Sequence, residues 1–103
     1  MGRIRDRIPL TEKDLEYQVK DLAKVFGWRY YHTWRSIHSP AGFPDCVMVR
    51  GDRLVIAELK SEKGVVSEKQ QEWLDCLGNV GDKDVQVYLW RPCDLEKIVE
   101  VLR

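Results

Sequence analysis

Long apolar runs are missing from this sequence: no stretch approaches the ~20 consecutive apolar residues that a membrane-spanning helix needs. The N-terminal segment, MGRIRDRIPL, lacks the apolar core of a signal peptide. Internal repeats, low-complexity segments and linker-like stretches are also missing. These features argue against a membrane-spanning, secreted or repeat protein, and we expect a cytoplasmic protein with no membrane partner.

The sequence also lacks metal-binding cysteine patterns and an excess of either charge. The three cysteines, Cys46, Cys76 and Cys93, are odd in number and widely spaced, with no CxxC pair and no Cys/His ligand spacing. We therefore expect buried or half-buried thiols rather than a zinc site or a disulfide framework. The 17 basic and 17 acidic residues cancel, so net charge gives no sign of nucleic-acid binding. A carboxylate site can still recruit positive charge as metal ions.

The 103-residue chain has the size of one domain, and 44% hydrophobic with 33% charged residues is typical of a folded globular protein. Apolar residues at helical spacing, capping residues and β-rich runs predict the order helix, three strands, helix, strand, helix. The expected elements are helices over 11–26, from Ser67 to Gly78 or Gly81 and after Asp94, and strands over 28–33, 46–50, 54–60 and 85–90. This order indicates a single α/β domain over residues 1–103, with residues 1–10 as an extended N-terminal arm.

The central pair of strands carries the most informative polar residues. These strands are joined at Gly51-Asp52, which is a hairpin signal, and a two-residue turn there pairs Asp45 with Glu58. Lys60 lies two residues beyond Glu58 and projects from the same side of the sheet. We therefore expect the three side chains to converge at the open end of the hairpin. A three-residue turn would move every side chain to the other face and leave an ordinary surface Glu–Lys pair.

Two carboxylates that face each other across a hairpin repel and need compensation. Their Cβ atoms lie about 5 Å apart, where like charges are destabilising. Lys60, a divalent metal or a raised pKa on one carboxylate would each compensate, and hard oxygen ligands suit Mg²⁺ or Mn²⁺. The first helix adds an acid, because its apolar stripe points Glu12 more nearly at the sheet than Glu16. An acid in the first turn also has a structural explanation in the helix dipole.

Gln70 and His32 each allow a structural and a functional interpretation. Gln70 continues the buried stripe of the second helix, where its amide needs a partner, but Ser67-x-x-Gln70 is itself a capping box. His32 ends a strand beside an open loop, so it is either a substrate contact or an ordinary strand residue. His38 is expected to be a plain loop residue.

Four motifs, taken together, carry a family resemblance. In order along the chain they are Gly42-Phe43-Pro44-Asp45, Glu58-Leu59-Lys60, Gly64 and Ser67-x-x-Gln70-x-x-Trp73. This combination resembles the VRR-NUC family, the virus-type replication-repair nucleases of the PD-(D/E)xK superfamily. Thr11-Glu12 at the start of the first helix and Phe26-Gly27-Trp28 at its end extend the resemblance over nearly the whole chain.

The resemblance implies both a fold and an activity. The fold is a restriction-endonuclease-like αβββαβ core, a mixed central sheet flanked by helices, with an extra C-terminal helix. The activity is Mg²⁺- or Mn²⁺-dependent cleavage of DNA phosphodiester bonds, with no organic cofactor. Stand-alone, phage-like members resemble Holliday junction resolvases. The expected enzyme is therefore a homodimer that acts on branched or duplex DNA, in a bacterial or phage-infected host cell.

The resemblance also implies roles for individual residues. Those implicated in metal binding or catalysis are Asp45, Glu58, Leu59 through its carbonyl, Lys60, Gln70 and Glu12. Lys60 would orient or deprotonate the attacking water or stabilise the transition state, and Gln70 would position Lys60 or a backbone phosphate. Relatives often carry glutamine where this chain has Glu16, so either Glu12 or Glu16 reaches the metal, with the stripe geometry favouring Glu12.

DNA contacts are expected from the loop that precedes Gly42. Arg35, Ser36 and Ser39 are phosphate-binding candidates by type and placement, with His32 beside them. The alternative to an enzyme is a non-catalytic DNA- or protein-binding module with a vestigial nuclease site. A further alternative is an unrelated α/β interaction domain.

Overall fold

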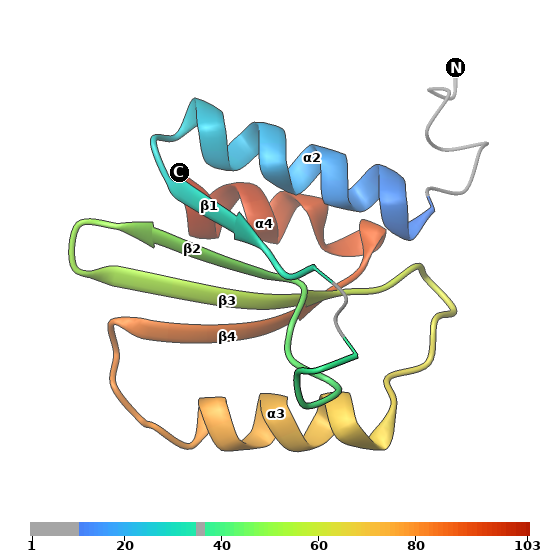
Figure 1. The fold of residues 1–103 in the computed structure, drawn as a ribbon. Coiled ribbons are helices and arrows are strands. Elements are labelled where there is room, and N and C mark those ends of the chain that lie inside the picture. Colours follow the sequence, from blue (N-terminus) through green and yellow to red (C-terminus); the bar gives the residue numbers. More distant parts are fainter. Residues whose placement is uncertain (1–10, 35–36) are drawn as a thin grey trace.

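The elements of the protein follow the order predicted from the sequence. The structure, a computed structural model, describes residues 11–34 and 37–103. The predicted N-terminal arm, residues 1–10, and the candidate DNA contacts Arg35 and Ser36 lie outside the described residues. The elements are α2 (Glu12–Val25), β1 (Arg29–His32), β2 (Cys46–Arg50), β3 (Arg53–Leu59), α3 (Glu68–Gly78), β4 (Val85–Trp90), the 3-10 turn η1 (Pro92–Asp94) and α4 (Leu95–Leu102) (Figure 1).

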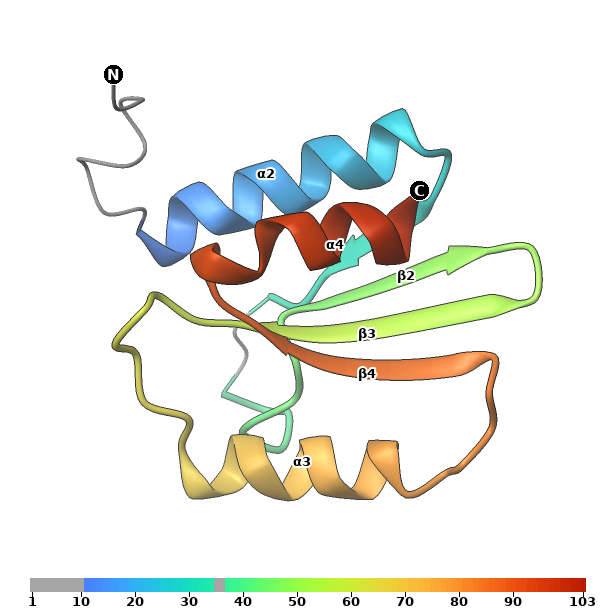
Figure 2. The ribbon, with the colours of Figure 1, turned by 180° about the vertical axis from the view of Figure 1, so that it is seen from behind.

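The strands form one mixed sheet in the order β1-β2-β3-β4. The pairs β1–β2 and β2–β3 are antiparallel, whereas β3 and β4 are parallel and are joined through α3. Figures 1 and 2 show α2 and α4 on one face of the sheet and α3 on the other. The predicted α/β class, with a mixed sheet flanked by helices and a helix at the C-terminal end, is confirmed. In the described part of the chain, no helix is long and apolar enough to cross a membrane.

The main core lies between the sheet and the two helices α2 and α4. Helix α2 begins at a capping box, in which Thr11 Oγ1 accepts from the Asp14 N–H at 3.0 Å and Asp14 Oδ2 accepts from the Thr11 N–H at 3.1 Å. It ends where Gly27 takes a φ of +80°. The buried core residues are Leu15, Val19, Ala23, Trp28, Cys46, Met48, Val55, Ala57, Leu59, Trp90, Ile98 and Leu102.

The β2–β3 hairpin has the predicted register. Val49 pairs with Leu54 across a two-residue turn, in which Gly51 takes a φ of +61° that glycine adopts without strain. Asp45 directly precedes β2, so the same register places it opposite Glu58. The alternative of a three-residue turn, which would have turned every side chain to the other face, is excluded.

Strand β3 alternates between the two faces of the sheet. Val55, Ala57 and Leu59 are buried in the core that α2 and α4 cover. Because successive side chains of a strand point to opposite faces, Glu58 and Lys60 project toward the α3 side. The open end of the hairpin therefore carries its charged side chains on the face opposite the main core.

The prediction for the cysteines is right for one and wrong for two. Cys46 is buried, and burial followed by the charge of Asp45 raises the pKa of its thiol to about 12. Cys76 and Cys93 are exposed. The reason is that α3 buries only one face, and Cys76 lies on the other, while Cys93 lies in the short η1 turn at the surface.

Candidate active site

The loop before β2 is fixed against the start of α3. Gly42 has a φ of +96°, and a Cβ at this position would lie 2.6 Å from the backbone carbonyl of Lys69. Glycine is required here for both its conformation and its lack of a side chain. The next residue, Phe43, packs edge-on against Trp73 of α3, with ring centroids 5.1 Å apart. The Gly-Phe pair of the motif thus holds the loop in place for the residues that follow.

Asp45 is fixed at the end of this loop by three hydrogen bonds. Thr33 donates its N–H to the Asp45 carbonyl at 2.7 Å and its hydroxyl to the carbonyl of the buried Pro44 at 2.6 Å. On the other side, Asp45 Oδ2 accepts from the backbone N–H of Leu59 at 2.7 Å. The carboxylate therefore has a defined position beside the end of β3.

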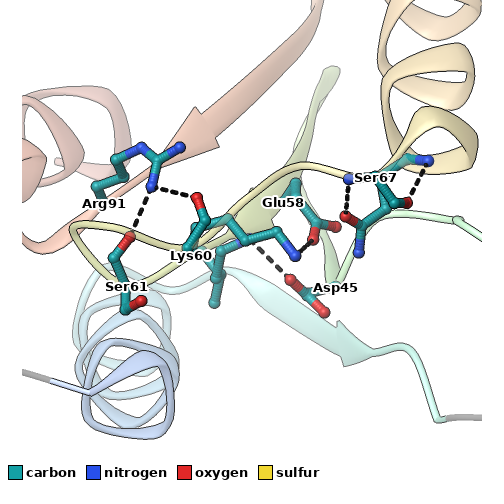
Figure 3. A network of polar contacts seen from close by, with 9 residues as sticks. Asp45, Glu58, Lys60, Ser61, Ser67 and Arg91 are labelled. Carbon is teal, nitrogen blue, oxygen red and sulfur yellow. Dashed lines mark hydrogen bonds and ion pairs between the residues drawn. The ribbon is translucent and has the colours of Figure 1, made fainter.

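Glu58 is a carboxylate that folding has removed from water. Its residue is 1% exposed, and its Oε2 lies 3.3 Å from Lys60 Nζ. Among the described residues, no donor reaches its buried Oε1. Burial, and then the charge of Asp45, raise the pKa of Glu58 to about 7, against the opposing effect of Lys60. Figure 3 shows Asp45, Glu58 and Lys60 close together at the ends of the two strands, as the sequence predicted.

Lys60 is followed by a turn that Arg91 holds. Arg91 Nη1 donates to the backbone carbonyls of Ser61 at 2.7 Å, Glu62 at 3.1 Å and Gly64 at 2.8 Å. Figure 3 shows Arg91 beside Ser61 at this turn. A Cβ on Gly64 would lie 3.3 Å from Lys60 Cδ, so the turn packs closely on the lysine side chain. Sequence reasoning missed Arg91, because an arginine after the last strand carries no local sign of its carbonyl partners.

The two candidate acids of α2 have different surroundings. Partial burial, and then Asp45, raise the pKa of the exposed Glu12, while Lys60 opposes this effect, so Glu12 lies within electrostatic reach of both. Glu16 Oε1 instead lies 3.7 Å from His32 Nε2. This arrangement favours Glu12 over Glu16 as the acid that accompanies the central cluster, and it gives His32 a partner within the protein.

Gln70 adopts the structural alternative of the two that its sequence allowed. Its Oε1 accepts from the Ser67 N–H at 2.9 Å, and Ser67 Oγ accepts from the Gln70 N–H at 3.1 Å, which completes a capping box. A contact of Gln70 with Lys60 is not part of this geometry. Ser39 is exposed in the loop before β2, and its proposed phosphate contact stays a prediction, as does the metal contact of the Leu59 carbonyl.

The fit of this cluster to a divalent cation can be judged from Glu58 Oε1. A buried carboxylate oxygen without a donor is destabilising unless a proton or a cation satisfies it. Carboxylate oxygens of Asp45 and Glu58 are the hard donors that Mg²⁺ and Mn²⁺ prefer, so the residues fit the ion. Within residues 11–34 and 37–103, no group of three or more His, Cys, Asp or Glu side chains is arranged to hold a metal. Water and substrate oxygens would have to complete the coordination, as is usual for Mg²⁺.

Comparisons with protein-family models, with curated proteins and with solved structures found no match. The observations that bear on function are therefore the carboxylate–lysine cluster and the order of the four sequence motifs.

Proposed function

We propose that the protein is a Mg²⁺- or Mn²⁺-dependent DNA endonuclease of the PD-(D/E)xK type. The observation that carries this proposal is the buried Glu58, which lies beside Asp45 and Lys60 and whose Oε1 has no hydrogen-bond partner among the residues that the structure describes. The order of the elements agrees with the αβββαβ core that the VRR-NUC resemblance implies. The motif glycines support the proposal further. Gly42 packs against the start of α3 in the loop that leads to Asp45, and Gly64 packs against the side chain of Lys60.

The roles of the residues follow from their chemistry. Asp45 and Glu58 would hold the cation, which when bound lowers the pKa of a water and neutralises charge on the scissile phosphate. Lys60 supplies a fixed ammonium beside that position and stabilises negative charge that develops on the phosphate oxygens. Hydrolysis adds a water oxygen to the phosphorus, with one proton of that water passing to bulk water, and releases a sugar oxygen, which takes up a proton. Lys60 and bulk water are the donors available for that proton.

The same proposal includes a homodimer and a branched or duplex DNA substrate. Two copies of one site, related by two-fold symmetry, match a substrate with two equivalent strands. An exposed apolar side chain on the strand β1 beside the site, Tyr31 at 61%, supports an interface in that region. Sedimentation at micromolar concentration should give twice the 12.1 kDa mass of the chain.

The activity is tested by a cleavage panel. Four-way junctions, flaps, single strands and duplex are incubated with the protein in Mg²⁺, in Mn²⁺ and in EDTA. We expect cleavage of at least one structure with either metal and none in EDTA. Lys60→Met keeps the aliphatic stem of the side chain and should lower the rate at least a hundredfold. Tight DNA binding without cleavage of any structure would refute the nuclease hypothesis and support the non-catalytic binding module.

A further inference from the structure

A hollow of the described surface lies away from the carboxylate cluster. It has a volume of about 800 Å³, is open to solvent and lies at the tip of the β2–β3 hairpin, beside the C-terminal half of α2. The residues that line it are Lys20, Asp21, Lys24, Gly27, Trp28, Arg29, Tyr30, Val49, Arg50 and Gly51. None of the predicted site residues is in this set.

The hollow is strongly basic, although the chain as a whole is neutral. Of the described residues that line it, Lys20, Lys24, Arg29 and Arg50 are cationic and Asp21 is acidic. The first three are exposed and make no ion pair with any residue that the structure describes. A lysine near the C-terminus of a helix complements the helix dipole, which accounts for Lys24 but not for the convergence of the others.

Arg50 contributes a guanidinium that the protein holds in a fixed orientation. Its Nη1 donates to the carbonyls of Phe26 and Leu102, both at 2.9 Å, its Nη2 donates to the Arg103 oxygen at 3.2 Å, and its Cζ lies 4.6 Å from the centre of the Trp28 ring. Arg53 lies over the same ring at 5.0 Å. Carbonyls and an aromatic ring orient a guanidinium but leave its positive charge in place. The base of the hollow thus carries a guanidinium in a defined position.

We propose that this hollow binds the phosphate backbone of a DNA arm that extends away from the cleavage site, an inference that rests on the proposed nuclease function. A single small anion is a poor match for the hollow, because its cations are spread over α2 and two strands around a large open space. A row of phosphates offers negative charges at a comparable spread. Such contacts position a duplex without reading its sequence.

The length of α2 sets the spacing between the two sites. Its first residue, Glu12, is within electrostatic reach of Asp45, and its last turn, which contains Lys24, lines the hollow. A helix of 14 residues spans about 20 Å, and Figure 1 shows it running alongside β1 toward the hairpin tip. At a rise of about 3.4 Å per nucleotide, this length corresponds to about six base pairs. The hollow should therefore contact the arm about six base pairs from the scissile phosphate.

The experiment combines two arm lengths with two matched variants. Binding of junctions with arms of about four and about twelve base pairs is measured in EDTA, as a function of salt, for wild type and for Lys20→Gln/Lys24→Gln. The control, Lys83→Gln/Lys97→Gln, also removes two exposed lysines, but neither lines the hollow. We expect Lys20→Gln/Lys24→Gln, the hollow variant, to bind junctions with long arms about tenfold more weakly than wild type. The slope of its log binding constant against log salt concentration should be smaller by about two. Short arms and the control variant should show wild-type behaviour.

Each alternative result has a clear meaning. Equal losses in both variants, or a loss in the hollow variant that is the same for short and long arms, would overturn the proposed arm contact. Displacement of the DNA by a poly-glutamate peptide that binds the protein as tightly as DNA does would also overturn the proposed arm contact. It would indicate an acidic protein partner instead. If wild type binds long arms more tightly than short arms but cleaves no DNA, the proposed nuclease activity is refuted, whereas the hollow remains a DNA-binding site.

Discussion

Replacing Glu58 by glutamine should make the protein more stable at alkaline pH in the absence of metal. The wild-type carboxyl is buried beside Asp45, and both effects raise its pKa to about 7 from an ordinary value of 4.5. Because the folded state prefers the protonated form, the contribution of Glu58 to stability is fully present below pH 4.5. It is lost as the pH rises through about 7. Glutamine has nearly the same shape and no charge, so the variant lacks this loss.

The expected size of the effect follows from the same values. Each unit of pKa corresponds to about 1.4 kcal/mol, so the rise from 4.5 to about 7 corresponds to about 3 kcal/mol. The ion pair with Lys60 opposes the rise, and its effect is already contained in this value. Most substitutions at buried positions lower stability. A substitution that raises stability is expected where function maintains an unfavourable charge.

Urea unfolding in EDTA at pH 5 and pH 8 measures the effect, with the fluorescence of the buried Trp28 and Trp90 as the signal. The free energy of unfolding of wild type should fall between these pH values relative to that of Glu58→Gln. Glu96→Gln, at an exposed position of α4, should keep the wild-type pH dependence. Parallel pH profiles for wild type and Glu58→Gln would refute the reasoning, because they would mean that Glu58 is solvated like an ordinary surface acid.

Three further predictions concern the cation and the supports of the site. Mg²⁺ should raise the melting temperature of wild type more at pH 8 than at pH 5, since it binds the ionised carboxylate, and calorimetry should show no such rise for Glu58→Gln. Gly42→Ala should lower the free energy of unfolding by about 2 kcal/mol or more, because its Cβ would meet backbone atoms. Gly27→Ala has open space around its Cβ, so it should lower the free energy of unfolding by about half as much in the same urea titration. Arg91→Met removes the donor to the three carbonyls and should slow single-turnover cleavage about tenfold; an unchanged rate would show that the turn does not position Lys60.

The elements and the hairpin register were predictable because their signals are local. Thr11 and Ser67 start helices through side chains three residues from their partners. Gly51 permits the tight turn that sets which residues of the hairpin face each other. The convergence of Asp45 with Glu58 follows from that register alone, so this part of the candidate site needed no knowledge of the tertiary structure.

The remaining features depend on contacts between distant segments. Arg91 reaches the turn after Lys60 across 27 to 30 positions of sequence, and nothing near it in the chain indicates those carbonyls. The two interpretations of Gln70 differed only in where a flexible amide points, which the spacing of residues cannot decide. The basic hollow arises because α2 ends beside the hairpin tip, and the net charge of zero concealed it.

The most direct test of the nuclease site is the single-turnover cleavage rate of Asp45→Asn in Mg²⁺, measured beside Asp52→Asn. Asparagine at position 45 can still accept the hydrogen bond from Leu59 while it removes the charge, and Asp52 is an exposed acid at the hairpin tip. We expect that Asp45→Asn loses at least a hundredfold in rate while it remains folded, and that Asp52→Asn cleaves like wild type. Cleavage by Asp45→Asn at the wild-type rate would show that the Asp45 carboxylate takes no part in the reaction.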